Sequence, residues 1–186
     1  LKKGGGGKRS FRFKWADVQH ILAVAVEEKR PSVGVALAIA FATVQRISDV
    51  IAFDDAIVAA EDAKPRLKFV QSKTGKQVDM RMPDIVAELL LAHPPAATAE
   101  PRNARPWIVS EETRAPYHEK TIARVFARIL AKAIAKDRRK WKHLTGGQLR
   151  DGRRSGFVHR IENGATVEQV AAISGHSLDE GYRIVE

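Results

Sequence analysis

Apolar residues recur at helical spacing through the first part of the chain. The first run begins at Trp15 and continues three and four residues apart, at Val18, Ile21, Leu22 and Ala25. Pro31 ends this run or restarts it. We expect a second apolar helix over residues 33–45 and a short helical segment over residues 46–53. Residues 54–65, where Ala, Glu and Asp predominate, suggest a loop.

The apolar period changes to two between residues 66 and 82. Five apolar side chains alternate with polar ones on either side of a turn sequence: Leu67, Phe69, Val78, Met80 and Met82. The turn itself, residues 73–76, contains a glycine, so the segment predicts a β-hairpin. Pro83 then opens a helix that continues to about Leu91, before two consecutive prolines end it.

Helical spacing returns after an irregular stretch that extends to about Tyr117. A long amphipathic helix is marked by Ile122, Val125, Phe126, Ile129 and Ala133. Residues 136–142 form its strongly basic tail, and Thr166 with Gln169 predicts a capped helix that ends before Gly175. The pattern as a whole predicts a mainly α protein with a small antiparallel β-sheet, of the α+β class.

Length and composition indicate one globular domain. The 186 residues are 44% hydrophobic and 29% charged. Residues 1–14 begin with a basic, glycine-rich stretch and are expected to be a flexible linker, whereas residues 15–186 form the domain. The longest apolar run, residues 33–42, is too short to span a bilayer. The sequence contains no cysteine, which excludes disulfides and thiolate metal sites.

The net charge of the chain indicates the kind of partner that it binds. Lys and Arg number 32 against 22 Asp and Glu, which gives a formal net charge of +10. Such a surface favours polyanions and associates with them fastest at low salt. Nucleic acid is therefore the first expected partner, ahead of a membrane surface, because no helix has a basic face opposite a broad apolar one.

Two basic residues in the first half are candidates for phosphate chemistry, and each has a simpler interpretation. Arg46 lies three residues before Asp49, and such a spacing on a helix often means only an ion pair. Lys73 lies at the expected hairpin tip within Ser-Lys-Thr-Gly, where a lysine is usually a solvated turn residue. Taken singly, both simpler interpretations are favoured.

The last fifth of the chain holds the other candidates. Arg150 and Arg153 lie where a helix is expected to begin, and Ser-Gly-His-Ser, with His176, directly follows the capped helix. The alternative is an exposed basic face that contacts DNA phosphates without chemistry, formed by Arg150, Arg153, Arg154 and Arg160. A histidine alone would likewise be structural.

The order Arg-x-x-Asp, Ser-Lys-Thr-Gly, Arg-x-x-Arg and Ser-Gly-His resembles the active-site series of the tyrosine recombinase (phage integrase) family, and the resemblance extends from Trp15 to Glu186. It implies that Arg46 and Arg153 hold the scissile phosphate, with Asp49 holding the Arg46 guanidinium. It also implies that Lys73 protonates the leaving 5′ oxygen and that His176 donates a hydrogen bond in the transition state. Arg150 stands where the family usually has histidine, and it can donate to phosphate but cannot act as a base.

The resemblance also implies a tyrosine nucleophile, which forms a 3′-phosphotyrosyl bond without a metal or a cofactor. Tyr182 is the only tyrosine after His176, and it follows by six residues, which is closer than the family spacing. We therefore expect the nucleophile just beyond Glu186, in a C-terminal end that this sequence lacks. Tyr182 and Tyr117 are the alternatives within the sequence.

The function that the resemblance implies is site-specific DNA recombination or integration, by a homotetramer on paired sites of double-stranded DNA. A cytoplasmic location in a bacterial or phage-infected cell is expected. Two alternatives remain open at this point. One is a DNA-relaxing enzyme of the type IB topoisomerase class, and the other is a non-catalytic, basic DNA-binding module with a decayed site.

Overall fold

A computed structural model describes residues 10–60 and 64–186. The elements run in the order α1 (Trp15–Glu27), α2 (Pro31–Thr43), α3 (Ile47–Val50), a 3-10 turn η1 (Asp55–Ile57), β1 (Val58–Ala59), β2 (Arg66–Val70), β3 (Gln77–Arg81), α4 (Asp84–Ala92), α5 (Glu119–Lys136), α6 (Arg138–Trp141), a 3-10 turn η2 (Lys142–Leu144), α7 (Asp151–Glu162), α8 (Val167–Ser174) and α9 (Leu178–Val185). Helices dominate, and the predicted α+β class is confirmed.

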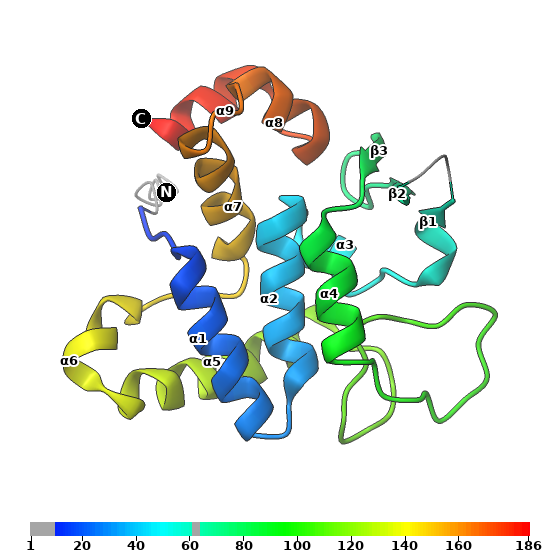
Figure 1. The fold of residues 1–186 in the computed structure, drawn as a ribbon, viewed down its shortest axis with the longest axis vertical. Coiled ribbons are helices and arrows are strands. Elements are labelled where there is room, and N and C mark those ends of the chain that lie inside the picture. Colours follow the sequence, from blue (N-terminus) through cyan, green and yellow to red (C-terminus); the bar gives the residue numbers. More distant parts are fainter. Residues whose placement is uncertain (1–9, 61–63) are drawn as a thin grey trace, which may run out of the picture.

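Helix α2 lies at the centre of the molecule, where α1, α4 and α7 surround it (Figure 1). Its sequence is apolar on all sides, and such a helix has to be buried around its whole circumference. Eleven of its 13 residues are buried. The helix therefore forms the axis of the core, and its C-terminal end points toward the residues discussed below.

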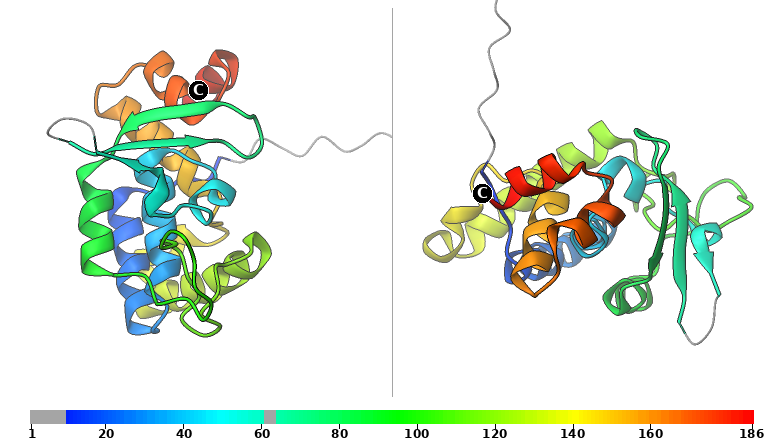
Figure 2. Two further views of the ribbon diagram at one scale, coloured as in Figure 1. Left: turned by 90° about the vertical axis from the view of Figure 1, so that its right-hand side faces the viewer. Right: turned by 90° about the horizontal axis from the view of Figure 1, so that it is seen from above.

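The sheet has three antiparallel strands in the order β1-β2-β3, and it lies at one edge of the helical body (Figure 2). The predicted hairpin is present, with Val70 paired to Gln77 at its end. The expected loop over residues 54–65 is partly wrong, because η1 and β1 lie within it. Strand β1 is only two residues long and is defined by its pairing with β2, so no local period could reveal it.

The first residues of the described chain pack onto the core. Residues 1–9 of the expected linker lie outside the described part, and the domain boundaries remain a prediction. Phe13 is buried, its ring meets Phe126 edge to face, and its N–H donates to Ser155 Oγ at 2.8 Å. Phe13 of the expected linker is thus in contact with α5 and α7.

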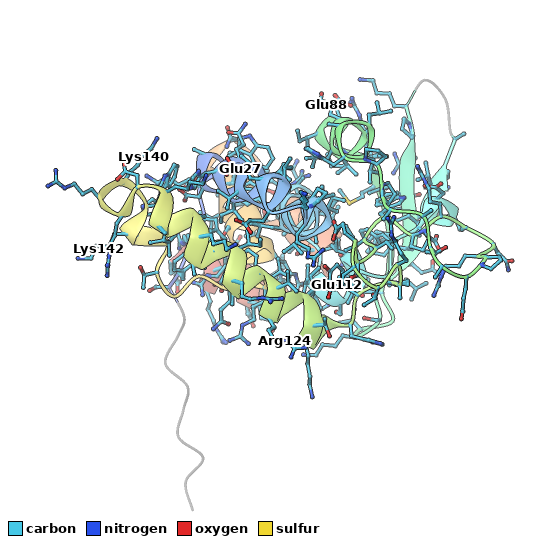
Figure 3. All side chains as sticks on the ribbon, turned by 90° about the horizontal axis from the view of Figure 1, so that it is seen from below. Glu27, Glu88, Glu112, Arg124, Lys140 and Lys142 are labelled. Atoms are coloured by element: carbon cyan, nitrogen blue, oxygen red, sulfur yellow. The ribbon has the colours of Figure 1, made fainter. Side chains whose placement is uncertain are left out.

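Charged side chains cover the outside of α5 and α6. Arg124 on α5 and the lysines at positions 140 and 142 point away from the body (Figure 3). Lys132 and Lys136 form ion pairs with Glu28 and Glu27 on α1. In the part of the chain that the structure describes, no helix is long and apolar enough to cross a membrane.

Candidate functional site

Arg153 anchors the candidate site from the first turn of α7. Its Nε donates to the Val44 carbonyl at 3.3 Å, and its Nη2 donates to the Ser174 carbonyl at 2.5 Å. Val44 ends α2 with φ 60°, a left-handed conformation that strains a β-branched residue. Strain of this kind collects at functional sites, and here it turns the chain out of α2 toward Arg46.

His176 reaches the same place from the end of α8. The predicted Thr166 capping box is confirmed, and Gly175 ends the helix with φ 73°. The ring Nδ1 lies 2.8 Å from Ser174 Oγ and 3.5 Å from Arg153 Nη2. Because a guanidinium can only donate, Nδ1 acts as an acceptor and the proton belongs on Nε2.

The electrostatics of His176 agree with that tautomer. Burial first, and then the positive charge of Arg153, lower the pKa of His176 from its ordinary value of 6.5 to about 4. The ring is therefore neutral near pH 7, with an Nε2–H available as a hydrogen-bond donor.

Arg46 joins this group from the residue before α3. Its charge contributes to the lowering of both the His176 pKa and the Arg153 pKa. The Arg153 pKa falls to about 10, first through burial and then through Arg46, so Arg153 remains charged near pH 7. The charges of Asp49 and Glu180 offset part of this lowering, and a bound anion beside the two guanidiniums would offset it further.

The expected contact between Arg46 and Asp49 is wrong. Arg46 Nη1 instead donates to Gln71 Oε1 at 3.3 Å. Asp49 Oδ1 accepts from the Ser72 backbone N–H at 2.9 Å and from Ser72 Oγ at 2.6 Å. The carboxylate thus anchors the hairpin loop rather than the arginine.

Lys73 lies in that hairpin loop, residues 71–76, between the anchored Ser72 and Thr74. Its side chain is exposed and forms no hydrogen bond or ion pair with another residue of the described chain. Gly75, with φ 65°, allows the loop to turn back toward β3. The loop that carries Lys73 begins at Gln71, which contacts Arg46.

Arg150 is exposed just before α7 and lines an open pocket of about 570 Å³ with six other residues: Arg153, Arg154, His176, Glu180, Arg183 and Ile184. Glu180 is the acid in this set, and it accepts from the Ser177 N–H in the α9 capping box. Four arginines against one carboxylate make the pocket strongly positive. Three predicted residues, Arg150, Arg153 and His176, therefore share one pocket.

Both tyrosines of the sequence lie elsewhere. Tyr182 on α9 donates its hydroxyl to Glu168, which raises the Tyr182 pKa. Tyr117 is buried beside Glu111, and burial raises the Tyr117 pKa. Neither lines the pocket of Arg153 and His176.

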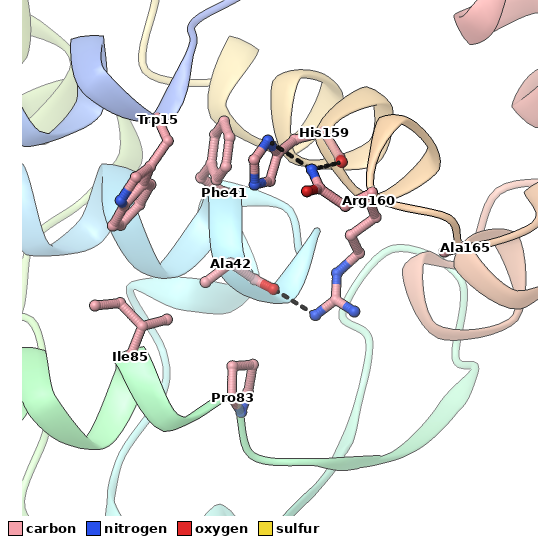
Figure 4. A pocket seen from close by; sticks show the side chains of 9 residues that line it. Trp15, Phe41, Ala42, Pro83, Ile85, His159, Arg160 and Ala165 are labelled. Atoms are coloured by element: carbon pink, nitrogen blue, oxygen red, sulfur yellow. Dashed lines mark hydrogen bonds between the residues drawn. The ribbon is translucent and has the colours of Figure 1, made fainter.

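A second pocket, of about 470 Å³, lies beside the C-terminal end of α7 (Figure 4). Trp15, Phe41 and Ile85 form its apolar wall, and the Arg160 guanidinium donates to the Ala42 carbonyl at 2.7 Å. Arg160 thus stabilises the C-terminal end of α2. Arg153, Arg154 and Arg160 are each partly buried, so these basic residues of α7 do not form an exposed face.

Two buried residues that the sequence analysis did not single out connect the site. Gln45 and Gln71 are both fully buried. Gln71 contacts Arg46, Gln45, Thr74 and the Ser174 carbonyl. Their sequence signal is weak, since a glutamine after an apolar helix or before a turn is ordinary. Among the described residues, no cluster of three His, Asp or Glu could hold a metal ion.

Comparison with solved structures shows which known fold this chain has. No protein-family model matches the sequence, and no curated protein matches it. Among solved structures, XerA recombinase superposes with a TM-score of 0.70 at 11% identity, over 99% of this chain and 62% of that one. The catalytic domain of bacteriophage HP1 integrase superposes with a TM-score of 0.63 at 18% identity, over 95% of this chain and 87% of that one. The chain has the fold of a tyrosine recombinase catalytic domain.

The same recombinase fold occurs in a lambda integrase dimer bound to a COC′ core site, with a TM-score of 0.69 at 19% identity. That comparison covers 98% of this chain and 49% of the integrase chain. The present chain thus spans about half of that integrase and less than two thirds of XerA recombinase. The candidate site lies in the part that carries the recombinase fold.

Proposed function

We propose that this chain is the phosphate-binding part of a tyrosine recombinase that cleaves and rejoins DNA. The observation that carries the proposal is the convergence of Arg46, Arg153 and His176 from three distant segments, within one recombinase-like fold. Neither Arg46 nor Arg153 forms an ion pair with a carboxylate in the described part of the chain. The site is therefore left with positive charge for an anionic ligand.

In this proposal each residue acts on one atom of the scissile phosphate. Arg46 and Arg153 bind its non-bridging oxygens and stabilise the negative charge of the transition state. His176 donates from Nε2, and Arg150 adds a third cation at the open side of the pocket. A tyrosine that has lost its hydroxyl proton to solvent bonds through its oxygen to phosphorus. As the P–O5′ bond breaks, Lys73 gives its proton to the 5′ oxygen.

The residues of the candidate site do not include the tyrosine nucleophile. Tyr117 and Tyr182 are each paired with a glutamate outside the pocket, so the proposal requires a different tyrosine, from another part of the protein or from another subunit. Double-stranded DNA is the proposed partner and a homotetramer the proposed assembly. The similar structures include a lambda integrase tetramer bound to a Holliday junction.

The test uses protein expressed from its whole reading frame and a nicked suicide DNA substrate. The expected result is a protein–DNA adduct that survives denaturant. Arg153→Lys keeps the positive charge but loses the planar guanidinium that can donate two parallel hydrogen bonds. We expect the adduct to form at least about 100-fold more slowly.

Arg160→Lys is the matched control. Arg160 lies on the same helix and also donates to a carbonyl near the end of α2, but it lines the other pocket. We expect adduct formation close to that of the unchanged protein. Equal loss in both variants would contradict the proposed role of Arg153.

The alternative of a non-catalytic DNA-binding module is favoured by one observation, the placement of both tyrosines away from the pocket. DNA binding that persists without any adduct, on nicked and intact substrates alike, would establish that alternative.

A further inference from the structure

The Gln71 carboxamide uses all four of its hydrogen-bonding positions, although it is fully buried. Its Nε2 donates to Gln45 Oε1 at 2.7 Å and to the Ser174 carbonyl at 2.9 Å. Its Oε1 accepts from Thr74 Oγ1 at 2.8 Å and from Arg46 Nη1 at 3.3 Å. The opposite amide orientation would face oxygen with oxygen at both Gln45 and Ser174, so the network fixes the orientation.

These four partners belong to three separate parts of the candidate site. Thr74 is in the hairpin loop, Arg46 precedes α3, and the Ser174 carbonyl lies two residues before His176. That carbonyl also accepts from Arg153 Nη2. One amide thus links the hairpin loop to both arginines and to the histidine turn.

Gln45 holds the Gln71 side-chain amide in place. It is fully buried as well, and its Nε2 donates to the carbonyls of Ile173 at 2.8 Å and Thr43 at 3.0 Å. The end of α2 is thereby tied to the end of α8. Gly175 lies against the same network, because a Cβ there would lie 2.1 Å from Gln71 Oε1.

Lys73 is held from both sides by this arrangement. Ser72 before it is bound to Asp49, and Thr74 after it is bound to Gln71. The lysine side chain stays free while its backbone is fixed relative to Arg46. We propose that Gln71 is a positioning residue that holds Lys73, Arg46 and the His176 turn in one geometry. The effect of Gln71 on catalysis rests on the proposed function, whereas its effect on the geometry of the site does not.

The experiment compares Gln71→Met with Gln77→Met. Methionine has a similar volume and no amide, and Gln77 is an exposed residue of the same hairpin. The first readout is backbone hydrogen exchange. In Gln71→Met we expect exchange to rise about tenfold in residues 71–76 and also in residues 173–176, with α2 unchanged.

The second readout is the rate of strand cleavage at saturating DNA, measured beside the dissociation constant for the same DNA. Misplacement of catalytic groups lowers the rate rather than the affinity, so we expect a loss of about 100-fold in rate with little change in affinity. Gln77→Met should match the unchanged protein in both readouts.

A double variant, Gln45→Met with Gln71→Met, separates positioning from stability. Replacing both side chains removes the Gln45 oxygen that Gln71→Met alone leaves unpaired, but the Thr43 and Ile173 carbonyls lose their donor. The double variant should therefore lose less melting temperature than the two single losses added together. The cleavage rate should remain low. Recovery of the rate together with stability would overturn the positioning role.

Failure of the proposed function would look different. In that case the unchanged protein forms no adduct, yet the exchange of residues 173–176 still responds to Gln71→Met. If exchange in Gln71→Met rises only in residues 71–76, or not at all, the coupling is refuted whatever the activity of the protein.

Discussion

Helix α7 carries Arg153, and its position against α2 depends on Gly156. A Cβ built on Gly156 would lie 1.9 Å from the Phe41 carbonyl oxygen and 2.7 Å from the Phe41 carbonyl carbon. Backbone atoms of a buried helix cannot move aside as a side chain can, so the Gly156→Ala variant must push the two helices apart. Overpacking of this severity costs about 3 kcal/mol, and alanine returns about 1 kcal/mol through its helix propensity.

The net loss of about 2 kcal/mol corresponds to a fall in melting temperature of roughly 4–8 °C for a chain of this size. Thermal unfolding followed by circular dichroism measures it. Gly152→Ala, one turn earlier on α7, is the matched control, because its Cβ would lie 2.9 Å from Leu37 Cδ1, the end of a side chain that can rotate. We expect this control to melt close to the unchanged protein. Equal melting temperatures for the two variants would refute the close approach of α7 to α2.

Two further predictions concern the charges of the site. Arg150→Ala should lower the salt dependence of DNA binding by about one counterion without a loss of stability. Arg102, exposed on another loop, is the control, and Arg102→Ala should leave the salt dependence unchanged. If the binding constants of both variants fall equally steeply with salt concentration, Arg150 does not contact a phosphate. His176 should titrate near pH 4 by NMR. Because its folded pKa lies below its ordinary value of 6.5, stability should fall as the pH is lowered from about 6.5 to about 4, and His176→Gln should remove that part of the fall.

The sequence predicted the longer helices because their patterns are amphipathic or wholly apolar. The basic tail expected for the long helix over residues 136–142 is wrong, because α5 ends at Lys136 and α6 is a separate helix capped by Asp137. Helix α5 has one apolar face, and Thr166 caps α8 as its spacing indicates. Strand β1 was missed because two residues have no period, and its existence depends on a partner strand. Local pattern determines an element only when the element is long enough to show one.

Some residues of the candidate site could also be predicted from the sequence, and others could not. Arg46, Lys73, Arg150, Arg153 and His176 could be named because their motifs, taken in order, resemble the active-site series of a known family, although each residue alone has a simpler interpretation. The partner of Asp49 could not be named, since the acid turns away from Arg46 toward Ser72 on the hairpin. The roles of Gln45 and Gln71 depend on contacts across more than 100 residues, at Ile173 and Ser174.

The neutral state of His176 follows first from burial and then from charges that would also bind a phosphate. Arg153 and Arg46 lower its pKa, and Glu180 in the same pocket raises it. A phosphate bound between these guanidiniums would offset their charge and would raise the His176 pKa, so binding of the anion and protonation of the ring are thermodynamically linked. The arginines therefore act on the histidine as well as on the phosphate. The ring keeps its Nε2–H in either state, because Nδ1 is the nitrogen that faces Arg153 and Ser174.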